Sequence, residues 1–399
     1  MITDFTNPER KKWSEITKRP ELDLKKIKPL VKKIFKDVTK NGDKSLYKYT
    51  KEFDKIDIKS IKTKRKDLLN SENKVSKKLK LAIKSAKKNI EKFHEAQKVV
   101  FKKIETEKGV ECWQEKKAIE KVGLYIPGGT APLFSTILML AIPAKIAECK
   151  EIILCTPPDK NGYIPNEILF TAKLCGVSKI YCVGGAQAIA AMTFGTESIP
   201  KVFKIFGPGN QYVTMAKQYS LNFNVSIDMP AGPSELLVVG DSSSNASFIA
   251  SDLLSQAEHG IDSQVILVST SKELIKSVKK QILIQVKLLT RKNIVEKSLK
   301  NAKFIYFKSK KDASDFINEY APEHYIISIE NEDYFTSNII NAGSVFIGKY
   351  SPESAGDYAS GTNHTLPTNG YSKQYSGVNV DSFTKTITFQ KISKSGLSN

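Results

Sequence analysis

A repeated unit of apolar run, glycine turn and helix-like stretch dominates the sequence from residue 123 onward. The first series contains GLYIPGG at 123–129, EIILCTPP at 151–158, KIYCVGG at 179–185 and FKIFGPGN at 203–210. A second series contains LLVVGD at 236–241, QVILVS at 264–269, KFIYFKS at 303–309, HYIISI at 324–329 and SVFIG at 344–348. Continuous apolar runs are typical of strands covered on both faces of a parallel sheet. The chain is therefore predicted to be α/β, with two Rossmann-like, doubly wound domains and a cleft between them.

A helical, lysine-rich region precedes these series, and its stretch 75–97 is amphipathic with helical period. Residues 1–121 contain 36 Lys+Arg and 19 Asp+Glu (36 − 19 = +17), whereas the rest of the chain contains 26 and 23 (+3). Only four of the 62 basic residues are arginine, the residue that best reads bases and clamps phosphates. We therefore expect no specific nucleic-acid partner, while non-specific contact stays open.

The apolar run at 131–144 is broken by Pro132 and Pro143 and is too short to cross a bilayer. We therefore expect no contact with a membrane. The five cysteines form no C-x-x-C pair, and no secretory signal precedes them. An odd number of cysteines in that context predicts reduced thiols and a cytoplasmic protein.

Gln256 and His259 stand three residues apart in SQAEHG, within an apolar pattern of helical period. Residues at i and i+3 share a helix face, so the amide oxygen and the imidazole are expected to converge on one point. Such a pair is half of a zinc site with nitrogen and oxygen ligands, although a capped helix end before Gly260 explains the same residues. Asp357, in the irregular segment 353–368, is either a third ligand or a turn residue.

APEH at 321–324 places Glu323 and His324 on adjacent residues after a proline. Such a pair can divide acid–base work, the carboxylate activating water and the imidazole taking a hydroxyl proton. A solvated loop pair is the alternative interpretation. His364 lies in a long glycine- and serine-rich segment, and irregular segments of that length usually carry function.

Three glycine turns follow predicted strands: IPGGT at 126–130, GGAQ at 184–187 and GPGN at 207–210. Their N–H groups can approach a phosphate at a helix start, but none matches G-x-G-x-x-G, and ordinary tight turns explain them equally well. Tyr125, Gln187 and Asn210 stand beside these turns and can bond a ribose or a carboxamide. Ligands of such sheets bind outside the carboxyl ends of the strands, and the turns and the Glu323–His324 pair all fall near strand–loop junctions.

Taken together and in order, these motifs resemble the histidinol dehydrogenase family. The resemblance runs from about residue 20 to the C-terminus and is strongest in GLYIPGGTAPLFSTILMLAIPAKIA, GGAQAIAAMTFGT, FGPGNQYV, DMPAGPSE, SDLLSQAEHG, APEHY, NAGSVFIG and GDYASGTNHTLPT. It implies an oxidoreductase of the last steps of histidine biosynthesis. Members oxidise L-histidinol to L-histidine with two NAD, through a bound L-histidinal.

The resemblance also implies a role for each matching residue. Glu323 would activate water for attack on the aldehyde, and His324 would be the general base of both oxidations. One zinc ion per subunit would be held by Gln256, His259 and Asp357. The substrate contacts that it implies are Ser234, Gln256, His259, His324, Asp357 and His364. The NAD contacts that it implies are Tyr125, Gln187 and Asn210.

The family is a homodimer in which a C-terminal helical segment gives the partner subunit a glutamate and a fourth zinc ligand, a histidine. No histidine follows His364, and the sequence stops inside a family block at 382–399. We therefore expect a truncated C-terminus, with only three protein ligands for zinc. The alternatives are a related zinc- and NAD-dependent dehydrogenase of another polar alcohol, such as a sulfonated propanediol, and an inactive NAD-binding remnant.

The expected domain organisation follows from the motifs. Residues 1–20 would form an N-terminal arm and 379–399 a short C-terminal tail. Residues 21–122 together with 236–378 would form the domain that carries the zinc and catalytic residues. Residues 123–235 would form the NAD-binding Rossmann-like domain.

Overall fold

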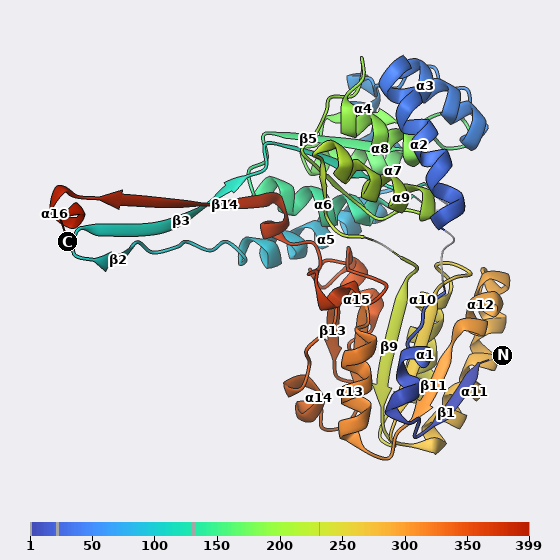
Figure 1. Cartoon of the computed structure of the whole chain (residues 1–399). Coiled ribbons are helices and arrows are strands. Elements are labelled where there is room, and N and C mark those ends of the chain that lie inside the picture. Colours follow the sequence, from blue (N-terminus) through green and yellow to red (C-terminus); the bar gives the residue numbers. More distant parts are fainter. Residues whose placement is uncertain (1, 21–23, 129–131, 231, 399) are drawn as a thin grey trace. The chain divides into compact units, whose positions relative to one another are not determined.

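The structure is a computed structural model that describes residues 2–20, 24–128, 132–230 and 232–398. The chain, whose course Figure 1 shows, divides into two compact units. Unit 1 comprises Met1–Lys26 and Met229–Gly377, and unit 2 comprises Ile27–Asp228 and Val378–Asn399. Each unit contains a parallel sheet with helices, so the predicted α/β class with two doubly wound sheets is confirmed.

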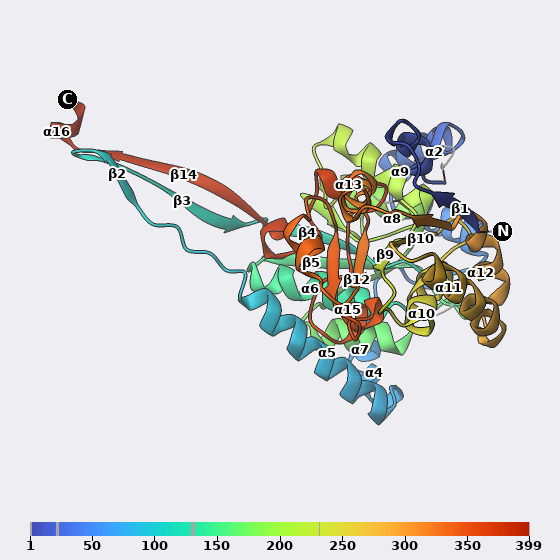
Figure 2. The same cartoon turned by 90° about the horizontal axis from the view of Figure 1, so that it is seen from below.

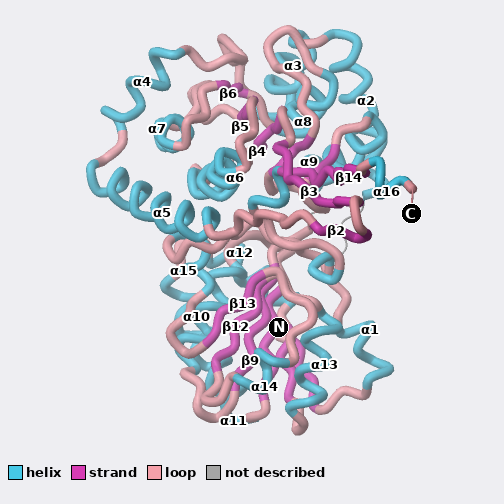
Figure 3. Tube along the Cα trace, turned by 90° about the vertical axis from the view of Figure 1, so that its left-hand side faces the viewer, coloured by secondary structure: helices cyan, strands magenta, loops and turns pink. Residues whose placement is uncertain are grey.

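Unit 1 is built on a six-stranded parallel sheet with strand order β1-β11-β10-β9-β12-β13 (Figures 1 and 3). Its strands are β1 (Thr3–Thr6), β9 (Glu235–Gly240), β10 (Gln264–Ser269), β11 (Lys303–Tyr306), β12 (His324–Ser328) and β13 (Ser344–Ile347). Its helices are α1 (Trp13–Ile16), α10 (Ala246–Ala257), α11 (Lys272–Gln285), α12 (Lys292–Ser298), α13 (Lys310–Tyr320), α14 (Asp333–Ser337) and α15 (Glu353–Tyr358). The strand order reverses between β9 and β12, which is the switch point of this sheet.

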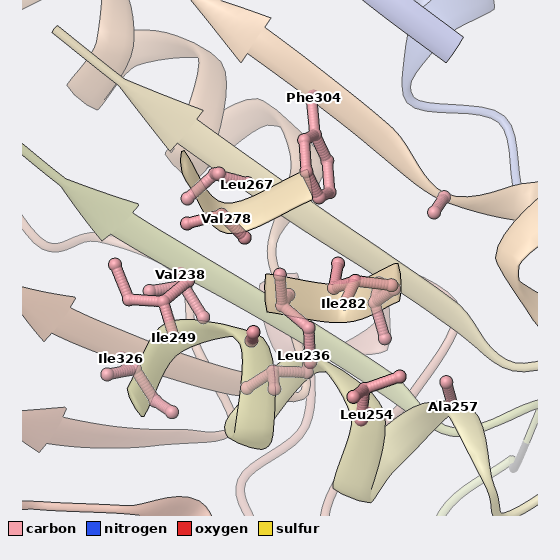
Figure 4. Close-up of a cluster of buried hydrophobic side chains, with 14 of the residues drawn as sticks. Leu236, Val238, Ile249, Leu254, Ala257, Leu267, Val278, Ile282, Phe304 and Ile326 are labelled. Atoms are coloured by element: carbon pink, nitrogen blue, oxygen red, sulfur yellow. The ribbon is translucent and has the colours of Figure 1, made fainter. Parts of the chain in front are cut away.

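Successive residues of β9 serve opposite faces of this sheet. Leu236 and Val238 pack with α10 and α11 in one core, which Figure 4 shows. Leu237 and Val239 pack in the other core, with α1 and α13. Because side chains alternate between the two faces, a strand buried on both faces reads as an uninterrupted apolar run. This burial is the physical origin of the pattern seen in the sequence.

Residues 1–20 are an integral part of unit 1. β1 pairs with β11 and extends the sheet. Trp13 of α1 is buried and packs edge-to-face against Phe307 and Phe316. The expected arm is therefore an edge strand and a core helix of the domain.

Unit 2 holds a five-stranded parallel sheet with strand order β6-β5-β4-β7-β8. Its strands are β4 (Lys121–Tyr125), β5 (Glu151–Thr156), β6 (Lys179–Cys182), β7 (Lys204–Phe206) and β8 (Ser226–Ile227). The helices are most of α2 (Leu24–Asn41), α3 (Asp43–Tyr49), α4 (Arg65–Lys74), α5 (Lys77–Glu95), α6 (Phe134–Ile146), α7 (Asn166–Leu174), α8 (Gly185–Phe194) and α9 (Gln211–Ser220). The strand order again reverses, here between β4 and β7.

The lysine-rich helices belong to unit 2. The predicted helix at 75–97 is confirmed as α5, which Ser76 caps by accepting the N–H of Leu79. Its buried side chains include Ile83 and Ile90, and the helix packs against α6. α4 likewise packs against α7. The expected domain organisation grouped residues 21–122 with 236–378. In the structure, residues 27–122 instead associate with the sheet at 121–227, because their apolar faces cover the helices of this sheet.

Part of the region predicted as helical forms a three-stranded antiparallel sheet, which we call the arm sheet. Its strands are β2 (Ile104–Glu107), β3 (Val110–Ala118) and β14 (Thr384–Ile392), and Figures 1 and 2 show it as a long ribbon. The expected C-terminal tail is therefore a strand paired over nine residues with β3. None of the helices in the described ranges is long and apolar enough to cross a membrane.

Candidate active site

The predicted catalytic and zinc-binding residues gather at the amino ends of β9 and β12. Glu235 and His324 are the first residues of these neighbouring strands, and His324 is in register with Leu236. Glu323 immediately precedes β12 and His324 begins it, which agrees with the strand predicted at 324–329. Parallel neighbours begin at the same edge of a sheet, so residues just before β9 and β12 meet there.

Glu323 and His324 are both buried, which excludes the solvated loop pair. Oε2 of Glu323 accepts the N–H of Glu235 at 2.8 Å and lies 3.5 Å from Nδ1 of His324. Nδ1 of His324 also lies 3.0 Å from the carbonyl oxygen of Glu235. Nε2 of His324 is buried and has no hydrogen-bond partner among the described residues.

Gln256 lies at the end of α10 with its amide in contact with this pair. Its Nε2 is 2.8 Å from Nδ1 of His324 and donates to the carbonyl of Glu235 at 3.3 Å. Its Oε1 is buried and accepts no hydrogen bond from the described part of the chain. α10 ends at Ala257, so His259 follows the helix, and its N–H bonds to the carbonyl of Gln256.

His259 is exposed at the edge of this cluster. Partial desolvation lowers the pKa of its imidazole, while the charges of Asp357 and Glu323 act to raise it and that of His324 to lower it. The carboxylates and the second imidazole are therefore close enough to act on His259 electrostatically. The imidazole nitrogens of His259 are not part of the compact group of donor atoms formed by His324, Glu353 and Asp357.

Asp357 lies in a buried cluster with His324 and Glu353. Nε2 of His324 is 3.7 Å from Oδ1 of Asp357 and 4.0 Å from Oε1 of Glu353, and the donor atoms of the three residues lie within 4.8 Å of one another. Both carboxylates come from α15, where the spacing of four residues puts them on one face. Sequence reasoning missed Glu353, although Glu-x-x-x-Asp in ESAGD carried the signal.

The charged groups of this cluster shift one another's pKa values. Burial alone would lower the pKa of His324, but Glu323, Asp357 and Glu353 raise it well above its usual value. Burial and the charge of Asp357 raise the pKa of Glu353, whose Oε2 accepts the hydroxyl of Ser255 at 2.9 Å. Burial acts to raise the pKa of Asp357, but the nearby imidazoles of His324 and His364 together outweigh burial and lower it. Asp357 is therefore the carboxylate that stays ionised.

The two remaining predicted substrate contacts also lie at this end of unit 1. Nδ1 of His364 is 3.0 Å from the carbonyl oxygen of Asp357, and the charge of His364 is one of the causes that lower the pKa of Asp357. Ser234 is half-buried just before β9, and its carbonyl accepts the N–H of Gln264. The structure thus brings all seven residues predicted for catalysis, zinc or substrate to one region of unit 1.

The donor set here fits a zinc ion. Zinc accepts imidazole nitrogen and carboxylate or amide oxygen. The unpartnered Oε1 of Gln256 is the informative atom, because a buried carbonyl oxygen without a donor costs free energy unless something ligates it. The ionised carboxylate of Asp357 supplies the charge that a divalent ion needs.

The predicted NAD contacts lie in unit 2, at the carboxyl ends of its strands. Tyr125 ends β4, and Gly207 follows β7, so the two flank the switch point of the sheet. Gly207 has a φ of +123°, and a Cβ there would lie 2.0 Å from the carbonyl oxygen of Tyr125. Only glycine permits that approach. The location is where doubly wound sheets bind ligands.

The three side chains assigned to NAD are differently engaged. The hydroxyl of Tyr125 accepts the N–H of Gly185 at 3.0 Å. Gln187 is buried in α8, and its Oε1 has no partner among the described residues, which fits a buried amide that holds a ligand. Asn210 is the N-cap of α9 and accepts two backbone N–H groups, a role that sequence reasoning missed. Gly129 and Thr130 of the first turn lie outside the described residues.

Comparison with known proteins identifies the family of the chain. A family model for histidinol dehydrogenase matches residues 17–399. A histidinol dehydrogenase of Bacteroides fragilis is 58% identical over 393 residues, 98% of this chain and 91% of the relative. That of Bacteroides thetaiotaomicron is 55% identical over 397 residues, 100% of this chain and 93% of the relative. The crystal structure of histidinol dehydrogenase from Elizabethkingia anophelis is 52% identical, with a TM-score of 0.97 and coverage of 100% and 92%. The chain therefore belongs to the histidinol dehydrogenase family.

Proposed function

We propose that the chain oxidises L-histidinol to L-histidine through L-histidinal and reduces two NAD per substrate. One observation carries this proposal: a buried Glu323–His324 pair lies beside the carboxylate of Asp357 and contacts the amide nitrogen of Gln256, whose amide oxygen has no partner among the described residues. The relatives supply the substrate, since they are named histidinol dehydrogenases. Those names do not favour a dehydrogenase of another alcohol or an inactive remnant.

One zinc ion per subunit is proposed to be held by Gln256, His259 and Asp357. Zinc, when bound, supplies a positive charge that fixes the imidazole and amine of the substrate. Ser234 and His364 are the further proposed substrate contacts. Asp357 beside His324 helps to raise the pKa of its imidazole, so ligation of Asp357 to a cation would favour the neutral imidazole that a base needs.

His324 is proposed to take the hydroxyl proton through Nε2. If Nδ1 carries a proton and donates it to the carbonyl of Glu235, the lone pair of Nε2 is free. The amide nitrogen of Gln256 competes for Nδ1 and favours the opposite tautomer, so NMR assignment of the His324 tautomer tests this step. Glu323, oriented by the N–H of Glu235, is placed to take a proton from the water that hydrates the aldehyde.

Each oxidation needs a hydride acceptor, which NAD supplies when bound beside Tyr125, Gln187 and Asn210. Two features support this location: the glycine turns end strands at a switch point, and the buried Oε1 of Gln187 lacks a partner. Closely packed backbone around a bound hydride acceptor excludes water from it. Gly184 meets that need, because a Cβ there would lie 2.5 Å from Cβ of Pro157.

A homodimer with shared site residues is part of this proposal. The arm sheet supports it, because the side chains of Ile104, Ile387 and Ile392 are exposed on it. Exposed apolar side chains on a sheet are typical of a surface that a partner covers. The cytoplasmic location and the absence of a specific nucleic-acid partner stay predictions.

The yield of NADH tests the proposed function. Zinc-loaded protein with excess NAD is expected to form two NADH per L-histidinol. Glu323→Gln is expected to slow oxidation of L-histidinal more than that of L-histidinol, because only the aldehyde must be hydrated. Glu330→Gln, which changes an exposed glutamate after β12, is the matched control. Protein that binds zinc and NAD but forms no NADH from L-histidinol would refute the proposal.

A further inference from the structure

Glu235 touches three of the functional side chains through its backbone alone. Its N–H donates to Oε2 of Glu323 at 2.8 Å. Its carbonyl oxygen lies 3.0 Å from Nδ1 of His324 and accepts from Nε2 of Gln256 at 3.3 Å. Since both backbone groups belong to one residue, a shift of Glu235 changes all three contacts together.

The side chain of Glu235 is in turn held by an arginine from the start of the chain. Nε of Arg19 donates to Oε1 at 2.8 Å, and Nη2 donates to Oε2 at 3.0 Å. The N–H of Asn369 donates to the same carboxylate at 2.6 Å. The guanidinium also lies 4.0 Å over the ring of Tyr320 and donates to its carbonyl. The planar fork of arginine permits this two-point contact, and lysine has no equivalent.

The ion pair is buried, with side chains that are 11% and 1% exposed for Arg19 and Glu235. Arg19 is not needed to attach the N-terminal segment to unit 1, because β1 pairs with β11 and Trp13 lies in the core. Arg19 is also one of only four arginines in a chain with 62 basic residues. Attachment of the N-terminal segment therefore does not by itself explain the ion pair between Arg19 and Glu235.

We propose that Arg19 and Glu235 are positioning residues for the active site. Arg19 fixes the carboxylate of Glu235, and the backbone of Glu235 fixes Glu323, His324 and Gln256. The inference rests on the proposed function for its catalytic readout, but its effect on Gln256 extends to zinc affinity, which is measured without turnover.

The test replaces the guanidinium of Arg19 by an ammonium group, which keeps the positive charge but loses the two-point contact. Arg19→Lys is expected to lower kcat about 10–100-fold and to weaken zinc binding by a similar factor, as loss of a group that orients a metal ligand does. KM for NAD is expected to stay unchanged, since the proposed NAD contacts belong to unit 2. Zinc affinity is read by competition with a chromogenic chelator, and kcat is measured well below each melting temperature.

Two further variants separate positioning from stability. Leu267→Ala, in the core of unit 1, lowers stability without touching the site, and it is expected to keep kcat and zinc affinity. Arg19→Met combined with Glu235→Gln removes both charges of the buried pair, so it is expected to melt at a higher temperature than Arg19→Met alone without recovering kcat.

Wild-type kcat and zinc affinity in Arg19→Lys would overturn the positioning role, as would an equal loss in Leu267→Ala. If the wild type binds zinc but does not oxidise L-histidinol, the proposed function fails, and the zinc affinity of Arg19→Lys still decides the inference.

Discussion

Replacing Lys217 by methionine is predicted to destabilise unit 2 and to weaken NAD binding. Nζ of Lys217 lies 2.5 Å from Oδ1 of Asp228 and donates to the carbonyl of Gly207 at 2.7 Å. The other oxygen of Asp228 accepts the N–H of Gly207 at 2.7 Å. The three residues thus form a closed ring that holds the turn ahead of Asn210, the proposed NAD contact.

The expected magnitude follows from burial. The two side chains of the pair are 3% and 1% exposed. Lys217→Met leaves the carboxylate of Asp228 buried without its cation, which costs about 3–5 kcal/mol. For a unit of this size, that loss corresponds to a fall in melting temperature of roughly 6–20 °C. Calorimetry measures the melting temperature. Quenching of the protein's fluorescence on titration with NAD measures the affinity for NAD.

A matched control is available in the same unit. Lys173 pairs with Glu72 at 2.9 Å, but these side chains are 34% and 43% exposed, so water screens the pair and Lys173→Met is expected to leave the melting temperature nearly unchanged. Adding Asp228→Asn to Lys217→Met removes the unpaired charge and keeps an acceptor for Gly207, so stability is expected to recover in part. Equal melting temperatures for the two lysine variants, or unchanged NAD affinity in Lys217→Met, would refute the reasoning.

Three further predictions concern zinc, the thiols and the arm sheet. Gln256→Ala is expected to weaken zinc binding at least about tenfold while NAD binding persists, by calorimetric titration of each ligand. At pH 8 Ellman's reagent is expected to modify Cys112 alone, since the other four thiols are buried. Burial raises the pKa of Cys175 to about 12, so the stability contributed by its neutral thiol is complete below pH 9 and is lost as the pH rises toward 12. In urea unfolding, Cys175→Ala is expected to reduce that loss by up to about 1.4 kcal/mol per pH unit. Ile387→Lys is expected to shift the protein toward monomer in sedimentation velocity, and an unchanged dimer would exclude the arm sheet from the interface.

The sequence alone predicted the features that depend on neighbouring residues. The strand at 236–240 is apolar throughout because both faces of its sheet are covered. Such uninterrupted apolar runs therefore predict a doubly wound fold. The helix at 77–95 has helical apolar spacing and a serine cap, both local signals. The motifs also supplied the family, and with it the expected roles of Glu323, His324 and Gln256.

Tertiary structure alone decided which distant residues meet. Arg19 and Glu235 are 216 positions apart, and no local pattern links them. β3 and β14 likewise pair across most of the chain, and no local pattern marks that pairing, so the sequence alone predicts helix for residues 104–118 and a tail for the C-terminal segment. Glu353 becomes part of the site only because α15 places it beside His324. Periodicity reports which face of an element is buried, whereas the identity of the partner depends on how the elements pack, and the chemistry of this site depends on those partners.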